Sequence, residues 1–316
     1  MDEKKIERLV LIDGHAMLYR AWFAFPKSLT KRDGTLVNAV YGFTRILLNV
    51  IDELRPEYLA VSFDVGRTFR HEMYKEYKAQ REKMPDELKA QEPITYELVR
   101  ALNLPVFTKE TFEADDVIGT LATQASLQLS EVSETIIVTG DKDSLQLVCD
   151  PAETLGPVRV YMPARANKPA VVYDEAAVVA DLGIKAGQIP DYKGLAGDHS
   201  DNIPGVRGIG PKTACELLTN FGSIEGIYTQ LDEKKTLPIK PALLEKLITG
   251  KESAFESKKL ATIVTDVPIT LDLEAARVRG YDKPTAVALF KDLEFGSLVS
   301  KLPGDAFEAS VQEALF

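Results

Sequence analysis

Nine carboxylates in five short segments are the residues whose type and spacing could do chemistry. They are Asp13, Asp64, Glu113, Asp115, Asp116, Asp141, Asp143, Asp198 and Asp201. Several acids brought to one place repel one another and cannot all ionise unless cations neutralise them. Carboxylate oxygens are hard ligands, which select Mg²⁺ or Mn²⁺. The nine acids therefore predict a site for two or more such ions, of the kind that hydrolyses phosphodiesters.

Predicted strands would bring these acids together. The runs at 9–13, 58–64 and 135–139 are apolar and β-branched, which predicts buried parallel strands. Acids stand at or just after the ends of these runs, and chemistry in an open α/β sheet collects at the carboxyl ends of the strands. Further expected elements are helices at 38–54, 88–102 (bent or split at Pro93), 115–129 and 143–148, a strand at 106–107, and an edge hairpin of 158–162 with 171–173.

The order of these elements predicts the domains. Strands and helices alternate up to about residue 165, which predicts an α/β fold with a doubly wound sheet, and helical patterns dominate from about residue 174. We expect a catalytic core over 1–185, a helical DNA-binding subdomain over 186–302, and a tail or linker over 303–316.

A glycine-rich segment at 203–214 predicts a helix–hairpin–helix that holds a DNA backbone. Its expected DNA-binding residues are Gly205, Gly208, Gly210, Lys212 and Thr213. The glycines let the backbone approach a phosphate, and the second helix would point its free N–H groups at it. Pro211 separates Gly210 from Lys212, so the segment is not a Walker loop. The alternative is a plain glycine-rich turn between helices.

Residues 66–85 predict a clamp on single-stranded nucleic acid. Basic and aromatic residues are interleaved there: Arg67, Arg70, Lys75, Lys78, Arg81 and Lys83 with Phe69, Tyr74 and Tyr77. Aromatic rings stack on bases while Lys and Arg hold the backbone. The segment is too polar to predict a core element, and the alternative is a solvated loop.

The composition is that of a globular protein, with 316 residues, 45% hydrophobic and 27% charged. The formal net charge of −10 is unfavourable for a nucleic-acid partner. Two Mg²⁺ ions would bring it to −10 + 4 = −6, and local basic patches would then steer DNA. Cys149 and Cys215 make no disulfide or zinc pattern. No segment reaches the roughly 18 apolar residues of a membrane span, and no signal peptide is recognised, which predicts a cytoplasmic protein.

Three other side chains leave alternatives open or favour the core. His15 and His199 flank the acids and are either hydrogen-bond donors to metal ligands or structural residues. Trp22 is expected in the core rather than under a base.

Seven separated segments resemble, in order, the 5′ nuclease domain of bacterial DNA polymerase I, which is related to phage 5′ nucleases and flap endonucleases. They are 11–15, 37–43, 69–72, 77–78, 113–116, 140–143 and 197–202, and the ending at 293–298 is also similar. The resemblance implies a PIN-like fold with a central, mostly parallel sheet flanked by helices, a helical arch at 66–85, and a helix–hairpin–helix assisted by K⁺. The chain is then either an excised polymerase domain or a free-standing homologue.

The resemblance also implies roles for single residues. Asp13, Asp64, Glu113, Asp115 and Asp116 would surround one metal ion, and Asp141, Asp143, Asp198 and Asp201 a second, partly through waters. Lys78 and Arg81 would bind the scissile phosphate, and Tyr77 could stack on an unpaired base. Arg20 and Arg70 would contact DNA.

The resulting hypothesis is a Mg²⁺-dependent 5′–3′ exonuclease and 5′ flap endonuclease that leaves 5′ phosphates. Its expected substrates are DNA with 5′ flaps or nicks and RNA primers, in replication and excision repair. We expect a monomer, associated with the bacterial nucleoid, that is fused to or works with a DNA polymerase. The alternatives are a PIN-like ribonuclease and a catalytically silent protein that binds DNA structures.

Overall fold

The computed structural model describes residues 7–165, 168–233, 239–278 and 280–304. Its strands form one sheet in the order β3-β2-β1-β4-β5-β6. They are β1 (Arg8–Asp13), β2 (Tyr58–Ser62), β3 (Val106–Phe107), β4 (Glu134–Val138), β5 (Val158–Met162) and β6 (Val171–Tyr173). The first five are parallel and β6 is antiparallel to β5. The predicted mostly parallel sheet and edge hairpin are thus confirmed.

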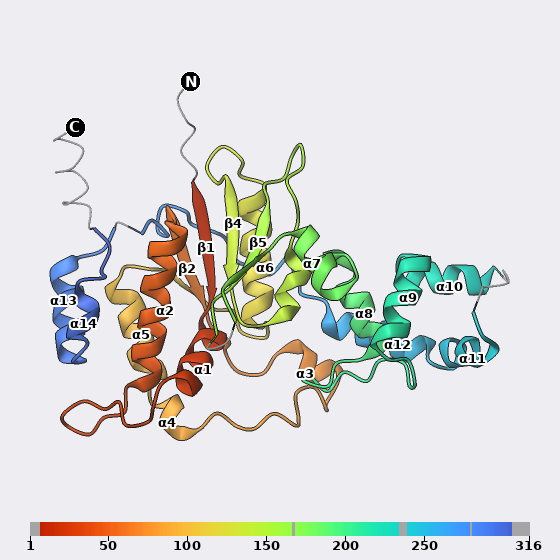
Figure 1. Cartoon of the computed structure of the whole chain (residues 1–316), viewed down its shortest axis with the longest axis horizontal. Coiled ribbons are helices and arrows are strands. Elements are labelled where there is room, and N and C mark those ends of the chain that lie inside the picture. The colour runs from red at the N-terminus through yellow and green to blue at the C-terminus, as the bar shows by residue number, and fades with distance from the viewer. Residues whose placement is uncertain (1–6, 166–167, 234–238, 279, 305–316) are drawn as a thin grey trace.

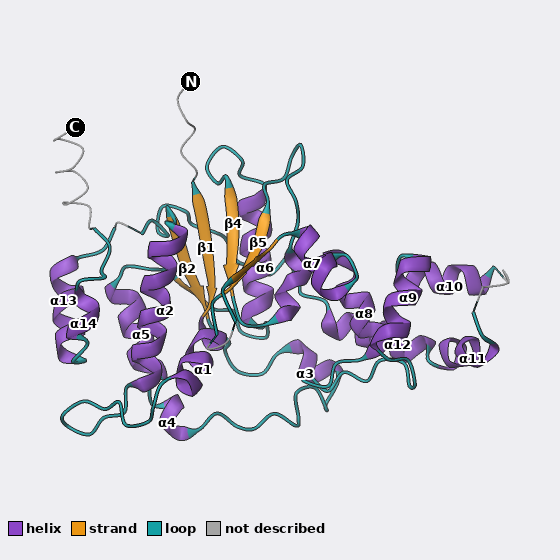
Figure 2. Ribbon diagram, in the orientation of Figure 1, coloured by secondary structure: helices purple, strands orange, loops and turns teal. Residues whose placement is uncertain are grey.

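Helices cover both faces of the sheet (Figure 2). They are α1 (Gly14–Ala24), α2 (Asn38–Leu54), α3 (Phe69–Met73), α4 (Asp86–Lys89), α5 (Glu92–Ala101), α6 (Ala114–Ser126), α7 (Glu175–Leu182), α8 (Ile189–Ala196), α9 (Pro211–Phe221), α10 (Ile224–Asp232), α11 (Pro241–Thr249), α12 (Lys251–Ala261), α13 (Lys283–Asp292) and α14 (Gly296–Val299). Two 3₁₀-helices lie at Lys142–Leu147 and Ala186–Gln188. Helix α1 was not predicted, and the short helix expected at 143–148 is one of the 3₁₀-helices.

The alternating directions of strand side chains build two cores. Leu9 and Leu11 of β1 point into a cluster with α6 and the helical region that follows β6. Val10 and Ile12 point to the other face, against α1, α2 and α5, where Trp22 is buried as predicted. Since both faces of the strands are covered, the strands read as continuous apolar runs, as buried parallel strands do.

Helices α8 to α12 extend away from the sheet at one end of the molecule (Figure 1). Helices α13 and α14 do not follow them. They return to the α/β core and pack in the same cluster as α2 and α5. The helical subdomain expected over 186–302 therefore contains two groups of helices that lie on different sides of the sheet. The tail expected at 303–316 lies outside the described residues from position 305 onward.

The segment at 66–85 differs from the helical arch that the resemblance implied. It contains the short helix α3 and otherwise runs as turns and extended chain to α4, crossing below α1 in Figure 1. Pro93 splits the expected helix at 88–102 as predicted, because α5 begins with Pro93 in its first turn and α4 ends before it.

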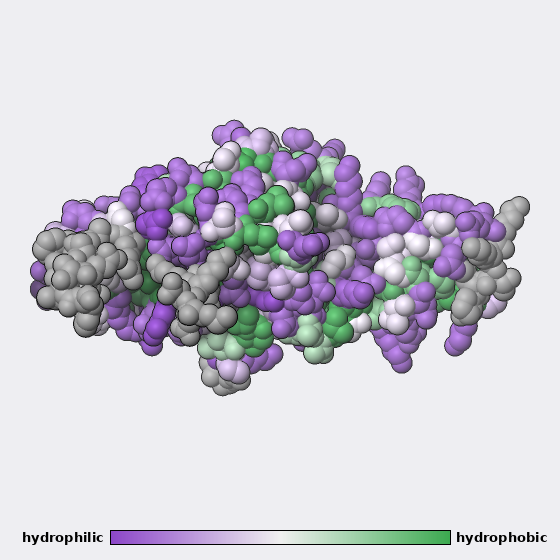
Figure 3. All heavy atoms as spheres, turned by 90° about the horizontal axis from the view of Figure 1, so that it is seen from above, coloured by the Kyte–Doolittle hydropathy of each residue, from purple (hydrophilic) through white to green (hydrophobic). Residues whose placement is uncertain are grey.

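Hydrophilic side chains predominate on the face seen in Figure 3, with hydrophobic ones scattered among them. Within the described residues, no helix is long and apolar enough to cross a membrane. Cys149 and Cys215 are partly buried free thiols.

Candidate metal centre and nucleic-acid interface

The carboxyl ends of β1, β2 and β4 bring the first acids together. Asp13 ends β1 and caps α1, accepting from the Ala16 N–H at 2.9 Å, and its other oxygen accepts from the Thr139 hydroxyl at 2.9 Å. Asp64 follows β2 and accepts from the Ala114 N–H at 2.8 Å, which ties this strand end to the start of α6. A cavity of about 200 Å³ is lined by acids from all three strand ends and from α6: Asp13, Asp64, Glu113, Asp115 and Asp141.

Asp13 and Asp115 have the charge environment of metal ligands. Burial and the charges of Asp64 and Asp141 raise the pKa of Asp13 to about 6. Burial and the charges of Glu113 and Asp116 raise the pKa of Asp115 well above its ordinary value. The Oδ1 atom of Asp115 is buried and has no hydrogen-bond partner among the described residues. A buried carboxylate oxygen without a partner fits a divalent cation.

A second acidic group lies where the 3₁₀-helix after β4 meets the loop after α8. Asp143, Asp198 and Asp201 each offer one oxygen, and these atoms lie within 4.8 Å of one another. The structure thus brings together three of the four residues expected around the second ion. Burial and the charge of Asp141 raise the pKa of Asp143 to about 7. A cluster of three hard oxygen donors suits Mg²⁺ or Mn²⁺.

Lys193 is a site residue that sequence reasoning missed. Its side chain is 10% exposed, and its ammonium group pairs with both Asp143 and Asp198. Burial by itself raises the pKa of Asp198, but the charge and hydrogen bond of Lys193 and the hydrogen bonds of Ser200 together hold that pKa below its usual range. The available signal was a lysine on a helix that ends directly before Gly197 and Asp198. Lys193 thus supplies part of the positive charge that the acids need.

The segment at 66–85 also lies against the acids. Lys78 Nζ is 2.8 and 2.9 Å from the two Glu113 oxygens, and Arg81 pairs with Asp201. The Tyr77 hydroxyl lies between two carboxylates, 3.0 Å from Glu113 and 3.2 Å from Asp201, and shares its one proton with them. Tyr77 is 3% exposed, so its ring is not open to a base in this conformation, contrary to the stacking role expected for it. The segment closes over the acids through these contacts instead of standing free in solvent.

Arg70 and Asp116 form a buried ion pair, which corrects two expectations. Both are fully buried, and the Arg70 guanidinium donates to the two Asp116 oxygens at 2.6 and 2.7 Å. Arg70 also donates to the carbonyls of Leu260 and Thr262. Arg70 therefore does not reach DNA, and the expectation that it contacts DNA is wrong. Both Asp116 oxygens accept hydrogen bonds, from Arg70 and from the N–H groups of Glu113 and Val264. Asp116 therefore supports the site instead of facing a metal ion.

His15 joins two carboxylates from different elements. Its Nδ1 lies 3.3 Å from Asp64 Oδ2, and its Nε2 lies 2.7 Å from Glu92 Oε1. Burial by itself lowers the pKa of His15, but hydrogen bonds and charge from Asp64 and Glu92 outweigh it and raise the pKa to about 9. Of the two readings left open for His15, hydrogen bonding to an acid at the site is the one that the structure supports. His199 is exposed.

The glycine-rich segment is a loop between α8 and α9 that serves two purposes. Gly205 is buried against Gly197, and an added Cβ would stand 2.2 Å from the Gly197 nitrogen. Gly205 is therefore a packing residue and not a DNA contact, which corrects its assignment. Gly208, Gly210 and Lys212 are exposed, Thr213 is half-buried, and α9 begins at Pro211 with Gly210 as its N-cap. Lys246 donates to the Gly208 carbonyl at 2.9 Å.

A carboxylate cluster at the strand ends of an α/β sheet is the arrangement of a site for divalent cations. The comparisons give the family. Residues 8–183 match the model of the 5′–3′ exonuclease N-terminal resolvase-like domain, and residues 184–284 match that of the 5′–3′ exonuclease C-terminal SAM fold. The chain therefore belongs to the 5′–3′ exonuclease family, whose domain is also found in DNA polymerase I.

Individual relatives agree with this assignment. DNA polymerase I of Chloroflexus aurantiacus is 47% identical over 301 residues, which cover 93% of this chain and 31% of that protein. DNA polymerase I of Bacillus subtilis is 40% identical over 316 residues, 100% of this chain and 34% of that protein. The chain thus spans about a third of these relatives. A bacteriophage T5 flap endonuclease, solved as a pseudo-enzyme–product complex with DNA and metal ions, shares the fold with a TM-score of 0.64 at 20% identity, over 92% of this chain and 98% of that one.

Proposed function

We propose that the chain is a two-metal 5′–3′ exonuclease and 5′ flap endonuclease that hydrolyses DNA and RNA primers to 5′-phosphate products. The observation that carries the proposal is the convergence of acids from three strand ends and from α6 under a cationic segment, Lys78 and Arg81. The similar T5 protein is described as a flap endonuclease in complex with DNA and metal ions, and the similar bacterial proteins are DNA polymerases.

The residues fit Mg²⁺ or Mn²⁺ at two positions. Asp13, Asp64, Glu113 and Asp115 would hold one ion, and Asp143, Asp198 and Asp201 the other, with Asp141 between the two groups. The unpartnered oxygen of Asp115 and the close approach of the last three acids support this assignment. Bound ions of this kind supply a water nucleophile at neutral pH and neutralise charge on the reacting phosphate.

Lys78 and Arg81 are the residues we assign to the scissile phosphate. In the structure they are hydrogen-bonded to Glu113 and Asp201. An ion held by these carboxylates would compete with Lys78 for both Glu113 oxygens and with Arg81 for one Asp201 oxygen. Lys78 and Arg81 would then have free N–H donors beside the acids, where an anionic phosphate would be held. The buried pair of Arg70 and Asp116 holds α3 against α6.

The exposed part of the glycine loop is the second contact with DNA. Lys212 and Thr213 in the first turn of α9, with Gly208 and Gly210, would hold the backbone of the duplex without reading its sequence. The N-terminal part of the chain would be the catalytic core and α8 to α12 the DNA-binding part. K⁺ is a candidate ligand for this loop. We further propose that the chain acts in replication and repair in the bacterial cytoplasm, as a monomer, with or within a DNA polymerase.

The test is cleavage of a 5′-labelled flap in Mg²⁺ and in chelator. A ribonuclease would cleave only an RNA strand, and a silent structure-binding protein would bind the flap and leave it whole. The proposal requires release of the flap with a 5′ phosphate left on the duplex, only when Mg²⁺ is present. The proposal fails if an intact flap persists over hours in Mg²⁺ with stoichiometric enzyme.

A further inference from the structure

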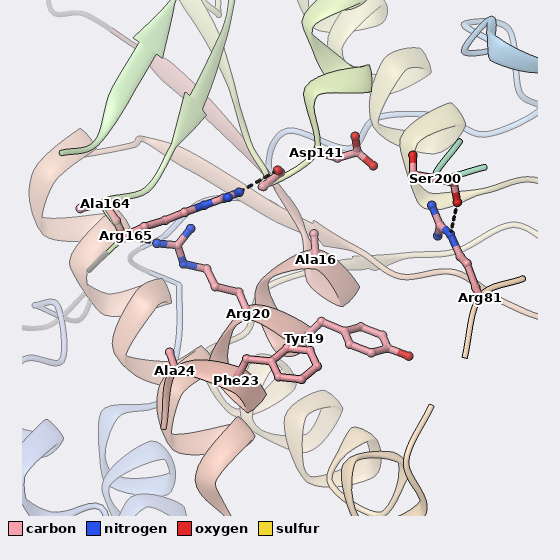
Figure 4. Close-up of a pocket in the computed structure, with 11 residues that line it drawn as sticks. Ala16, Tyr19, Arg20, Phe23, Ala24, Arg81, Asp141, Ala164, Arg165 and Ser200 are labelled. Atoms are coloured by element: carbon pink, nitrogen blue, oxygen red, sulfur yellow. Dashed lines mark hydrogen bonds between the residues drawn. The ribbon is translucent and has the colours of Figure 1, made fainter. Parts of the chain in front are cut away.

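A cleft of about 680 Å³ opens beside the acid-lined cavity, and Arg20 and Arg165 line it together with Arg81. Arg20 comes from α1 and Arg165 from the segment after β5, and their side chains lie side by side in Figure 4. Asp141 and Arg81 line both this cleft and the acid-lined cavity. The two hollows are therefore neighbours, and a strand bound across the acids would enter this cleft next.

Neither arginine is neutralised by an acid within the described residues. The Arg20 guanidinium donates to the carbonyls of Pro163, at 3.1 Å, and Ala164. Arg165 donates to the Gly140 carbonyl at 3.2 Å. Burial and the Arg165 charge lower the pKa of Arg20, so the two cations repel each other. Two fixed guanidinium groups without a carboxylate are satisfied when an anion lies between them.

We propose that Arg20 and Arg165 form a clamp for a second nucleic-acid phosphate, next to the scissile one. Arg20 was expected to contact DNA, but Arg165 was not singled out, and the phosphate they share is a new assignment. The ligand is a phosphate oxyanion of the substrate, either a phosphodiester of the cleaved strand or its 5′-terminal phosphate. The inference rests on the proposed function.

The clamp is fixed relative to the acids. Arg20 lies on α1, whose first turn is capped by Asp13. Arg165 is bonded to Gly140, directly before Asp141, and its Nη2 would lie 3.7 Å from a Cβ at Gly140. A phosphate held by both arginines is thereby placed in register with the carboxylates. Phe23, 80% exposed on the same cleft, offers a face to the base or sugar of that nucleotide.

The experiment is a double-mutant cycle in which one change removes a protein charge and the other removes a charge from the DNA. Flap substrates carry a neutral methylphosphonate at each position on either side of the scissile phosphate, and a second set ends in a 5′ phosphate or a 5′ hydroxyl. Parent, Arg165→Gln and Arg165→Lys are compared for binding by anisotropy in Ca²⁺ and for single-turnover cleavage in Mg²⁺. Arg100→Gln is the matched control, because Arg100 is an exposed arginine at the end of α5 that leads into β3, away from the acids.

The expected result is that neutralising one phosphate weakens DNA binding by the parent protein about tenfold, as loss of a charged hydrogen bond does. The same neutralised phosphate should weaken DNA binding by Arg165→Gln less than twofold, and binding by Arg100→Gln should weaken as much as that of the parent. Coupling to an internal methylphosphonate identifies a phosphodiester, and coupling to the 5′ end identifies the terminal phosphate; both support the clamp. Equal losses in parent and Arg165→Gln at every position, and at the 5′ end, overturn it. The binding arm decides this even if no cleavage occurs, in which case the proposed function fails separately.

Discussion

Neighbouring acids on α6 should respond in opposite ways to neutralisation. Asp116 is satisfied by four donors, whereas Asp115 has a buried oxygen with none. We predict that Asp116→Ala unfolds the protein more easily in the presence of chelator. Asp115→Asn, in contrast, should be as stable as the parent or more stable in chelator, and should lose cleavage.

The magnitude follows from the contacts. Removing one member of a buried ion pair costs about 3–5 kcal/mol, because the other charge stays buried without a partner. The N–H groups of Glu113 and Val264 would also lose their acceptor, at about 1–3 kcal/mol each. Glu113, 3.6 Å from Arg70 Nη1, offsets part of the loss. We therefore expect Asp116→Ala to lower the free energy of unfolding by roughly 5 kcal/mol or more, a large part of the ~5–15 kcal/mol of a typical domain.

Asp115→Asn has the opposite sign for an electrostatic reason. Its carboxylate is buried beside Glu113 and Asp116, which disfavours its charge. The amide keeps the shape and removes the repulsion. Urea unfolding in chelator, followed by circular dichroism, measures both variants, and a flap assay measures cleavage. The reasoning is refuted if Asp116→Ala is as stable as the parent, or if Asp115→Asn cleaves within about threefold of it, since a lost metal site should cost several kcal/mol of barrier.

Three further predictions test other parts of the site. Lys212→Ala should weaken binding to all duplex sequences alike and lower the salt slope by roughly one unit; an effect confined to one sequence would contradict a backbone contact. In chelator, the melting temperature should fall as the pH rises from ~4 to ~9. The pKa values of Asp13 (about 6), Asp143 (about 7) and His15 (about 9) are raised, so the folded protein holds protons that the unfolded chain releases at lower pH. A melting temperature that rises over this range would contradict these shifts. If the 5′ strand passes under residues 66–85, a bulky block placed on the flap end before the protein should slow cleavage strongly, and the same block added after binding should not; equal rates would leave Lys78 and Arg81 as an open electrostatic rim.

The sheet and the convergence of acids were predictable because each depends on local signals. Buried parallel strands need continuous apolar runs, and strand ends must meet at one edge, so Asp13, Asp64 and Asp141 could be placed together from the sequence alone. Pro93 likewise fixes a helix start by removing a backbone donor.

Partnerships between distant segments were not predictable. Arg70 lies in a basic, aromatic segment whose composition predicts solvent exposure. Only the tertiary fold shows that Arg70 donates to Asp116 and to the carbonyl of Leu260. Lys193 and Asp143 are far apart in the sequence, and nothing local marks their contact. A long, flexible cation can pair with any acid that the fold brings near, so composition alone cannot separate a DNA-binding arginine from a buried one.

The most direct measurement is anomalous diffraction from crystals of the protein soaked in Mn²⁺. The account predicts two strong peaks, one among Asp13, Asp64 and Asp115 and the other among Asp143, Asp198 and Asp201. It also predicts that Lys78 has left Glu113 in the same crystals, and that the first peak is lost in Asp115→Asn. Mn²⁺ absent from both positions, with Lys78 and Lys193 still paired to the acids, would contradict the claim that these carboxylates form a two-metal centre.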